Sequence, residues 1–155
     1  MTLVLVIGSG ARESIIIKKL LDDAKKINER VEIICIKTQE NTSIDEMCIK
    51  VYPMKYDVYE TMLQIDEEEQ EEIGFCIIGP EAPLEQQYAD YFEIQQISCI
   101  GPMQYYAQLE TSKQFCRNFL HSDSLLKEYS PKFNIIESKE KTYESIQSIF
   151  HKFDE

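Results

Sequence analysis

The chain has 155 residues, of which 43% are hydrophobic and 28% are charged, and its formal net charge is −12. This length suits a domain with its own hydrophobic core, and the composition is that of a globular protein rather than a disordered or fibrous one. The acidic balance argues against a nucleic-acid or acidic-membrane partner, because such partners require clustered lysine and arginine. No apolar run approaches the roughly 20 residues of a membrane helix, so we expect a cytoplasmic protein.

The first part of the chain alternates short apolar runs with longer amphipathic stretches. Residues 2–7 have the length of a buried strand, and residues 13–28 place apolar side chains on one face of a helix. Further elements follow in the same pattern: strands at 31–36, 75–78 and 97–100, and helices at 56–72 and 83–95. Strands that are apolar on both faces indicate a parallel sheet covered on both sides. We therefore predict an α/β fold with a Rossmann-like, doubly wound sheet.

The pattern changes after Pro102. We expect two short helices, a short strand and a final helix, at residues 103–109, 112–121, 132–137 and 141–153. These elements do not make another complete repeat of a strand and a helix. The sequence therefore predicts a Rossmann-like domain over residues 1–102 and a short α/β tail over residues 103–155. The only two histidines, His121 and His151, lie in this tail, and we expect no catalytic role for them.

The first candidate loop reads Gly8-Ser-Gly-Ala-Arg-Glu13 and follows the first predicted strand. Ligands of doubly wound sheets bind beyond the carboxyl ends of the strands. Glycine lets backbone N–H groups approach an anion at the start of a helix, and Arg12 adds a donor suited to phosphate. We expect a phosphate-bearing ligand; a turn with purely structural glycines is the alternative. A dinucleotide fingerprint would have a third small residue where Glu13 stands, so NAD and FAD are disfavoured.

The second candidate loop reads Gly79-Pro-Glu-Ala-Pro-Leu84 and follows the predicted strand at 75–78. Its two prolines stiffen the loop and hold Glu81 at the ligand-binding edge of the sheet. A carboxylate in this position is suited to sugar hydroxyls or to an amine. A structural proline turn would explain the same residues. The five cysteines are spread singly, without metal-ligand spacing, which favours reduced structural thiols.

Together with a third segment, Ala107-Gln-Leu-Glu-Thr-Ser-Lys-Gln-Phe115, these loops resemble the amino-terminal region of the glycinamide ribonucleotide synthetase (phosphoribosylamine-glycine ligase) family. The resemblance covers residues 2–37 and 75–120. It implies that a Rossmann-like pre-ATP-grasp domain precedes an ATP-grasp module, of which residues 103–155 would be the incomplete start. It also implies that the full-length family uses ATP with Mg²⁺ or Mn²⁺ to phosphorylate glycine, whose acyl phosphate is attacked by the amine of 5-phosphoribosylamine in purine synthesis.

The resemblance implies that the phosphoribosyl group of the substrate lies between the two loops. The implied binding residues are Gly8, Ser9, Gly10, Arg12, Glu13, Asn41, Gly79, Pro80 and Glu81. We expect no catalytic residue, metal ligand or cofactor site in this chain, because the ATP-grasp core would lie downstream. The chain alone is therefore expected to bind the substrate without catalysing the ligation, and the missing module would be its partner if it is a fragment.

Three positions depart from the pattern of the family. Ser14 stands where a histidine is usual, Gln87 replaces a glycine, and residues 38–43 match the usual Pro-Gly-Asn-x-Gly loop only at Asn41. These departures leave open a second function, a stand-alone non-catalytic module that binds a phosphoribosyl group or a nucleotide. Two further hypotheses are an oxidoreductase with a nucleotide cofactor and a different ATP-grasp enzyme, such as a carboxylase.

Overall fold

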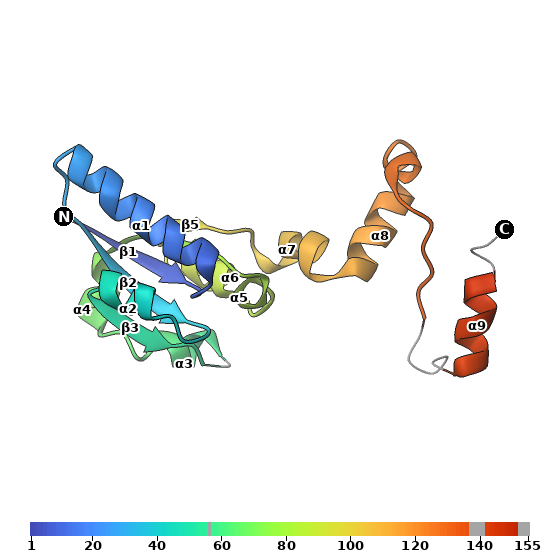
Figure 1. The fold of residues 1–155 in the computed structure, drawn as a ribbon, viewed down its shortest axis with the longest axis horizontal. Coiled ribbons are helices and arrows are strands. Elements are labelled where there is room, and N and C mark those ends of the chain that lie inside the picture. The colour runs from blue at the N-terminus through green and yellow to red at the C-terminus, as the bar shows by residue number, and fades with distance from the viewer. Residues whose placement is uncertain (56, 137–141, 152–155) are drawn as a thin grey trace. The chain divides into compact units, whose positions relative to one another are not determined.

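The structure is a computed structural model that describes residues 1–55, 57–136 and 142–151. The chain divides into two compact units, Met1–Ala107 and Gln108–Glu155. The first unit contains a parallel sheet with helices on both faces (Figure 1). The described residues contain no helix that is long and apolar enough to cross a membrane.

The sheet of the first unit has five strands in the order β3-β2-β1-β4-β5, all of them parallel. The strands are β1 (Thr2–Ile7), β2 (Val31–Lys37), β3 (Lys50–Pro53), β4 (Ile73–Ile78) and β5 (Cys99–Ile100). The helices are α1 (Ala11–Lys26), α2 (Thr42–Met47), α3 (Val58–Met62), α4 (Glu67–Glu72), α5 (Glu81–Glu85), α6 (Tyr88–Ile94) and α7 (Gln104–Thr111), which extends past the end of the unit. The predicted Rossmann-like α/β fold is confirmed.

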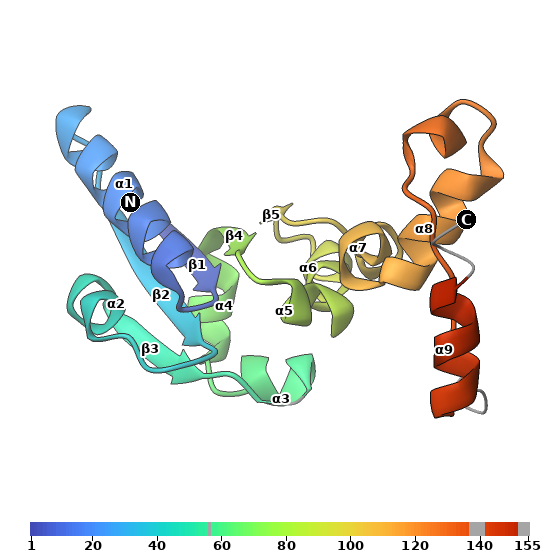
Figure 2. The same ribbon diagram turned by 45° about the vertical axis from the view of Figure 1, so that its right-hand side comes forward.

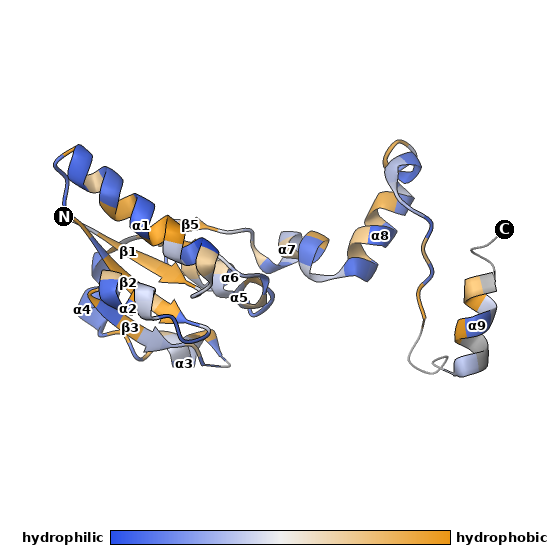
Figure 3. Ribbon diagram, in the orientation of Figure 1, coloured by the Kyte–Doolittle hydropathy of each residue, from blue (hydrophilic) through white to orange (hydrophobic). Residues whose placement is uncertain are grey.

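The side chains of the strands alternate between two hydrophobic clusters, one on each face of the sheet. Val4 and Val6 pack with Ile17 of α1 and Ile44 of α2. The other face carries the larger cluster, which includes these residues of β1, α3, α5 and α6: Leu3, Leu5, Ile7, Val58, Met62, Leu84, Tyr88 and Phe92. The apolar strands appear as orange arrows in Figure 3, whereas α1 alternates orange and blue, as expected for a half-buried helix.

Several element boundaries differ from the sequence prediction. The expected helix at 56–72 is two short helices, α3 and α4, and Asp57 caps the first through bonds from the N–H groups of Tyr59 and Glu60. The expected helix at 83–95 is also two helices, because Gln87 takes a left-handed conformation with φ of 64° between α5 and α6. Strand β3 and helix α2 were not expected. They lie beside β2, at the edge of the sheet opposite β5 (Figure 2).

The second unit contains α8 (Lys113–Ser122), a 3-10 helix η1 (Leu126–Tyr129) and α9 (Tyr143–His151). Ser112 caps α8, because its hydroxyl accepts a hydrogen bond from the N–H of Phe115 at 3.2 Å. The expected strand at 132–137 is wrong over residues 132–136, which form neither helix nor strand; residue 137 lies outside the described residues. A strand requires a neighbour to hydrogen-bond with, and none pairs with this segment in the part of the chain that the structure describes.

Candidate functional site

The two candidate loops meet at the carboxyl ends of β1 and β4. These strands are neighbours in the sheet, and the winding of the chain reverses between them, which is where doubly wound sheets bind ligands. The backbone joins the loops directly, since the N–H of Gly79 donates to the carbonyl of Ile7 at 3.0 Å. On the other side, the N–H of Gly8 donates to the carbonyl of Ile36 at 2.9 Å. The structure thus brings together the two segments that the sequence singled out.

The carboxylate of Glu13 fills the space between the two loops. Its side chain is buried, with 4% exposed, and its Oε2 accepts a hydrogen bond from the N–H of Gly10 at 2.6 Å. A Cβ atom at Gly79 would lie 2.5 Å from Cδ of Glu13, and one at Gly10 would lie 2.9 Å from its Oε2. Both distances are too short for a side chain, so these glycines make room for Glu13. The residue that breaks the dinucleotide fingerprint therefore has a structural role in this loop.

Gly8 is the glycine whose backbone requires the absence of a side chain. Its φ is 116°, a value that residues with a Cβ rarely adopt. A Cβ at this position would also lie 2.6 Å from Cδ of Pro80 and 3.0 Å from Cγ of Glu13. Gly8 and Pro80 thus pack closely, and this packing fixes the backbones of the two loops relative to each other.

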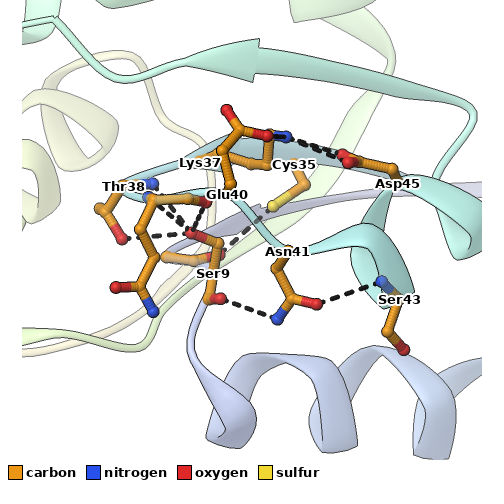
Figure 4. Close-up of polar contacts among 10 residues, drawn as sticks. Ser9, Cys35, Lys37, Thr38, Glu40, Asn41, Ser43 and Asp45 are labelled. Carbon is orange, nitrogen blue, oxygen red and sulfur yellow. Dashed lines mark hydrogen bonds and ion pairs between the residues drawn. The ribbon is translucent and has the colours of Figure 1, made fainter.

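Ser9 holds the loop that follows β2 (Figure 4). Its hydroxyl donates to the carbonyl of Gln39 at 2.6 Å and accepts from the N–H groups of Thr38 at 3.1 Å and Gln39 at 2.8 Å. The side-chain amide of Asn41 donates to the carbonyl of Ser9 at 2.9 Å, and its oxygen accepts from the N–H of Ser43 at 3.2 Å. Ser9 is fully buried, so the contacts place Ser9 and Asn41 as residues that position the loop.

Replacing Ser9 with alanine is expected to lower the free energy of unfolding by about 1 to 2 kcal/mol, because the backbone groups of Thr38 and Gln39 lose their internal partner. Hydrogen exchange measures the local effect: the amides of residues 38 and 39 should exchange faster in the variant. Ser14→Ala is the matched control, since the hydroxyl of Ser14 makes only an exposed bond to that of Ser43. Equal exchange at residues 38 and 39 in Ser9→Ala and the unmodified chain would contradict this role.

Lys37 ends β2 next to this loop and is already neutralised by carboxylates. Its Nζ lies 2.9 Å from Oδ1 of Asp45 and 2.9 Å from Oε2 of Glu40, and 13% of its side chain is exposed. Hydrogen bonds to Asp45 and Glu40 raise the pKa of Lys37. Lys37 was not among the residues predicted from the sequence, although a charged residue at the end of an apolar run is a usable signal.

A buried thiol forms a hydrogen bond with the backbone of the glycine loop. Sγ of Cys35 donates to the carbonyl of Gly8 at 3.3 Å, as Figure 4 shows. Contact with the Cys48 thiol and burial both raise the pKa of Cys35, so its thiol keeps the proton that this bond needs. All five cysteines are free.

Arg12 and Glu81 are the charged residues of the two loops that face solvent. The side chain of Arg12 is 60% exposed, and its Nε lies 3.2 Å from Oε1 of Glu13. Glu81 is the first residue of α5 and is exposed. The site therefore combines an exposed guanidinium, an exposed carboxylate and the start of α1, where the first N–H groups have no carbonyl partner within the helix. This arrangement is suited to a ligand that carries both a phosphate and hydroxyl or amine groups.

Comparison with known proteins identifies related chains. A family described as "Phosphoribosylglycinamide synthetase, N domain" matches residues 2–110. A phosphoribosylamine–glycine ligase of Methanocaldococcus jannaschii is 35% identical over 86% of this chain and 27% of its own length. One of Methanobrevibacter smithii is 30% identical over 97% of this chain and 31% of its own length. The bifunctional purine biosynthetic protein purD of Dictyostelium discoideum is 35% identical over 79% of this chain and 14% of its own length. The chain thus spans less than a third of each of these relatives.

A solved structure shares the fold. The crystal structure of N5-carboxyaminoimidazole synthetase from Staphylococcus aureus, complexed with ADP, aligns with a TM-score of 0.52 over 78% of this chain and 30% of that chain. The identity is 14%, so this likeness concerns the fold alone. Within the described ranges, no three His, Cys, Asp or Glu side chains gather to hold a metal ion.

Proposed function

The chain belongs to the phosphoribosylglycinamide synthetase family, and from this premise we propose that it is the phosphoribosyl-binding part of a phosphoribosylamine–glycine ligase of purine biosynthesis. One observation carries the proposal: the loops after β1 and β4 meet at the ligand-binding edge, with Arg12 and Glu81 exposed beside the start of α1. In such a ligase this part binds 5-phosphoribosylamine, and it does not catalyse the reaction by itself.

The phosphate of the substrate binds at the first turn of α1. The positive end of a helix and its N–H groups favour an anion there, and the guanidinium of Arg12 adds a charged donor. The N–H of Gly10 is already bound to Glu13, so it is not among the donors to the phosphate. Glu13, Ser9 and Asn41 act by holding the loops in place, and Gly8, Gly79 and Pro80 give the loops their close packing.

Glu81 binds the other end of the substrate. Glu81 is the first residue of α5, which follows directly on the Gly79-Pro80 turn. The backbone of Glu81 is therefore held in position before the ligand binds. An ionised carboxylate accepts hydrogen bonds from ribose hydroxyls and from an amine. Contacts of Arg12 and Glu81 with the two ends of the substrate orient its amine.

ATP and Mg²⁺ or Mn²⁺ belong, in this proposal, to the rest of the ligase. The relatives named above are three or more times longer than the part that aligns with this chain. ATP would supply the phosphoryl group that activates the carboxylate of glycine. The role of residues 1–107 is to present the amine of the phosphoribosyl substrate to that activated carboxylate.

The proposal is tested by calorimetric titration of the chain with ribose 5-phosphate, a stable stand-in for 5-phosphoribosylamine. We expect saturable binding that Arg12→Ala and Glu81→Ala each weaken about tenfold, which is roughly 1.4 kcal/mol and within the range of a charged hydrogen bond. Arg30→Ala is the matched control. Arg30 is exposed and precedes β2, so it lies at the amino ends of the strands, whereas the site lies at their carboxyl ends. Failure of the chain to bind, or equal weakening by Arg30→Ala, would contradict the proposed site.

A stand-alone module that binds a phosphoribosyl group or a nucleotide, without catalysis, is the second candidate. One observation favours it: Ser14 and Ser43, which lie in segments that depart from the family pattern, contact each other through a hydroxyl–hydroxyl bond of 3.3 Å. The departures at Ser14 and in residues 38–43 therefore lie in contact with each other. Titration with AMP distinguishes the two candidates, since a nucleotide module should bind AMP more tightly than ribose 5-phosphate.

A further inference from the structure

Two cysteines contact each other beside the loop that follows β1. Cys35 lies in β2 and is fully buried, and Cys48 directly follows α2 and is half-buried. Cys35 belongs to the apolar cluster that α1 and α2 form with the sheet, and Cys48 packs against the same cluster. The two thiols are close enough to share a hydrogen bond. The chain thus places two free thiols within reach of one another.

The buried thiol of this pair also bonds to the backbone of the proposed phosphoribosyl site. Sγ of Cys35 donates to the carbonyl of Gly8 at 3.3 Å. Gly8 is buried, and in the part of the chain that the structure describes no backbone N–H donates to this carbonyl. Gly8 packs on Pro80 of the second loop and precedes Ser9, which holds the loop after β2. A change at Cys35 therefore affects all three loops around the site.

The two thiols differ in exposure and in acidity. Cys48 is half-buried, so a molecule as small as hydrogen peroxide can reach its sulfur, whereas Cys35 is fully buried. The hydrogen bond from Cys35 lowers the pKa of Cys48, because it stabilises the thiolate. Contact with Cys48 and burial raise the pKa of Cys35, which therefore keeps its proton. Redox-sensing cysteines combine an accessible thiolate with a neighbouring resolving thiol in this way.

A second pair of cysteines is less suited to oxidation. Cys76 and Cys99 are paired residues of the neighbouring strands β4 and β5. Neighbouring strands lie about 4.7 to 4.9 Å apart, which is longer than the Cβ–Cβ separation of about 3.5 to 4.5 Å in a disulfide. Cys48, in contrast, lies between α2 and β3, so no strand pairing fixes its distance from Cys35. Cys35 and Cys48 are therefore the pair suited to a disulfide.

We propose that hydrogen peroxide converts Cys35 and Cys48 to a disulfide, and that this disulfide lowers the affinity of the phosphoribosyl site. The inference rests on the proposed function, since it concerns the regulation of the same site. The disulfide leaves the sulfur of Cys35 without a proton, so the buried carbonyl of Gly8 loses its donor. A buried carbonyl without a donor is unfavourable, and the loop rearranges to relieve this loss. Arg12 and the start of α1, which follow Gly8, then no longer keep their positions relative to the second loop.

The oxidation consists of two displacement steps. The thiolate of Cys48 attacks one oxygen of hydrogen peroxide, and the O–O bond breaks. The leaving hydroxide takes up the proton that Cys48 released, which gives water and a sulfenic acid. The sulfur of Cys35 then attacks the sulfur of Cys48, the S–O bond breaks, and the leaving hydroxide takes the proton of Cys35 to form a second water. Two thiols are thus oxidised to one disulfide, and one peroxide is reduced to two waters.

Mass spectrometry tests whether the disulfide forms. The reduced chain is treated with hydrogen peroxide, its remaining thiols are alkylated, and it is digested with trypsin. Cleavage after lysine and arginine places Cys35 in the peptide 31–37 and Cys48 in the peptide 38–50, so the disulfide joins two otherwise separate peptides. Dithiothreitol should separate them again. Absence of this linked pair of peptides would overturn the proposal.

Calorimetric titration with ribose 5-phosphate measures the effect on the site. We expect the oxidised chain to bind about fivefold more weakly than the reduced chain, the effect of a buried carbonyl that loses its donor, and dithiothreitol to restore the affinity. Cys48→Ser should bind like the reduced chain and keep its affinity after peroxide treatment, which also controls for oxidation of methionine. Cys99→Ser is the matched control, because it removes a half-buried thiol of the other pair and should respond to peroxide as the unmodified chain does. Equal affinities of the oxidised and reduced chains, or the same loss in Cys48→Ser, would contradict the switch.

Hydrogen exchange separates this proposal from the proposed function. The amides of Gly10, Thr38 and Gln39 are protected by bonds within the site, and they should exchange faster in the oxidised chain without any ligand. If the reduced chain does not bind ribose 5-phosphate, the proposed function has failed. The linked peptides and these amides then still decide on the switch, and unchanged exchange in the oxidised chain would overturn it.

Discussion

Replacing Gly8 with alanine is expected to lower the free energy of unfolding by about 3 kcal/mol or more. The backbone of Gly8 has φ of 116°, and forcing a residue with a Cβ into such a region costs about 1 to 3 kcal/mol. The new Cβ would also lie 2.6 Å from Cδ of Pro80 and 3.0 Å from Cγ of Glu13. Overpacking of this kind costs about 1 to 3 kcal/mol in addition, because the proline ring cannot rotate away and Glu13 is buried.

Urea unfolding followed by far-UV circular dichroism measures this loss. Gly74→Ala is the matched control, since Gly74 lies in β4 without a positive φ, and its added Cβ would meet Thr2 Cγ2 at 3.1 Å and the carbonyl of Leu3 at 3.4 Å. Alanine in a strand interior is more favourable than glycine, so we expect Gly74→Ala to change the stability by less than about 1 kcal/mol. Similar losses of unfolding free energy in both variants would mean that the positive φ of Gly8 does not contribute to the loss.

The sheet was predictable because its central strands are apolar on both faces. Residues 2–7, 31–36 and 75–78 are runs that only a buried parallel strand explains at this length, and all three are strands of the structure. β3 escaped prediction because it is a short edge strand that begins at Lys50 and ends at Pro53. Lysine and proline are common at sheet edges, where they interrupt the apolar pattern that identifies a strand.

The helices after β3 and β4 show where periodicity is insufficient. Apolar residues continue at helical spacing across the break between α5 and α6, so the pattern predicts a single helix there. Residues 66–72 contain no apolar side chain, so periodicity carries no signal for the break between α3 and α4. The break between α5 and α6 depends on Gln87, which adopts a left-handed conformation although no glycine marks the position. Its carboxamide bonds to Gln104, a residue far along the chain, and such a tertiary contact leaves no signal in the local sequence.

The candidate site was predictable as a pair of loops, but the roles within it were not. That the segments at 8–13 and 79–81 lie together follows from the strand order, which the sequence pattern implies. The burial of Ser9 depends on bonds to Thr38 and Gln39, and that of Glu13 on its place against Gly79. These partners lie far away along the chain. From the sequence alone, Ser9 and Glu13 were therefore expected to contact the ligand. Binding of the phosphoribosyl group by the predicted residues stays a prediction.

Glu13 and Gly79 are expected to be coupled energetically. Replacing Glu13 with alanine should lower the free energy of unfolding by about 2 to 3 kcal/mol, because the N–H of Gly10 loses its acceptor and a space opens between the two loops. Replacing Gly79 with alanine should cost a similar amount, since the new Cβ would lie 2.5 Å from Cδ and 2.6 Å from Cγ of Glu13. The two losses have one cause, the packing of a carboxylate against a bare backbone.

A double-mutant cycle tests this common cause. Once Glu13 is replaced by alanine, the Cβ that Gly79→Ala adds enters the space that the carboxylate leaves. Adding Gly79→Ala should then cost less than about 1 kcal/mol, and the coupling energy should reach about 2 kcal/mol. Gly101→Ala is the control in the same background: its added Cβ would meet Leu84 at 3.1 Å and Ile78 at 3.3 Å, but not Glu13. Its effect should therefore be additive with that of Glu13→Ala. Additive losses for Gly79→Ala as well would show that Glu13 and Gly79 act independently, and the two loops would then need another source of their fixed arrangement.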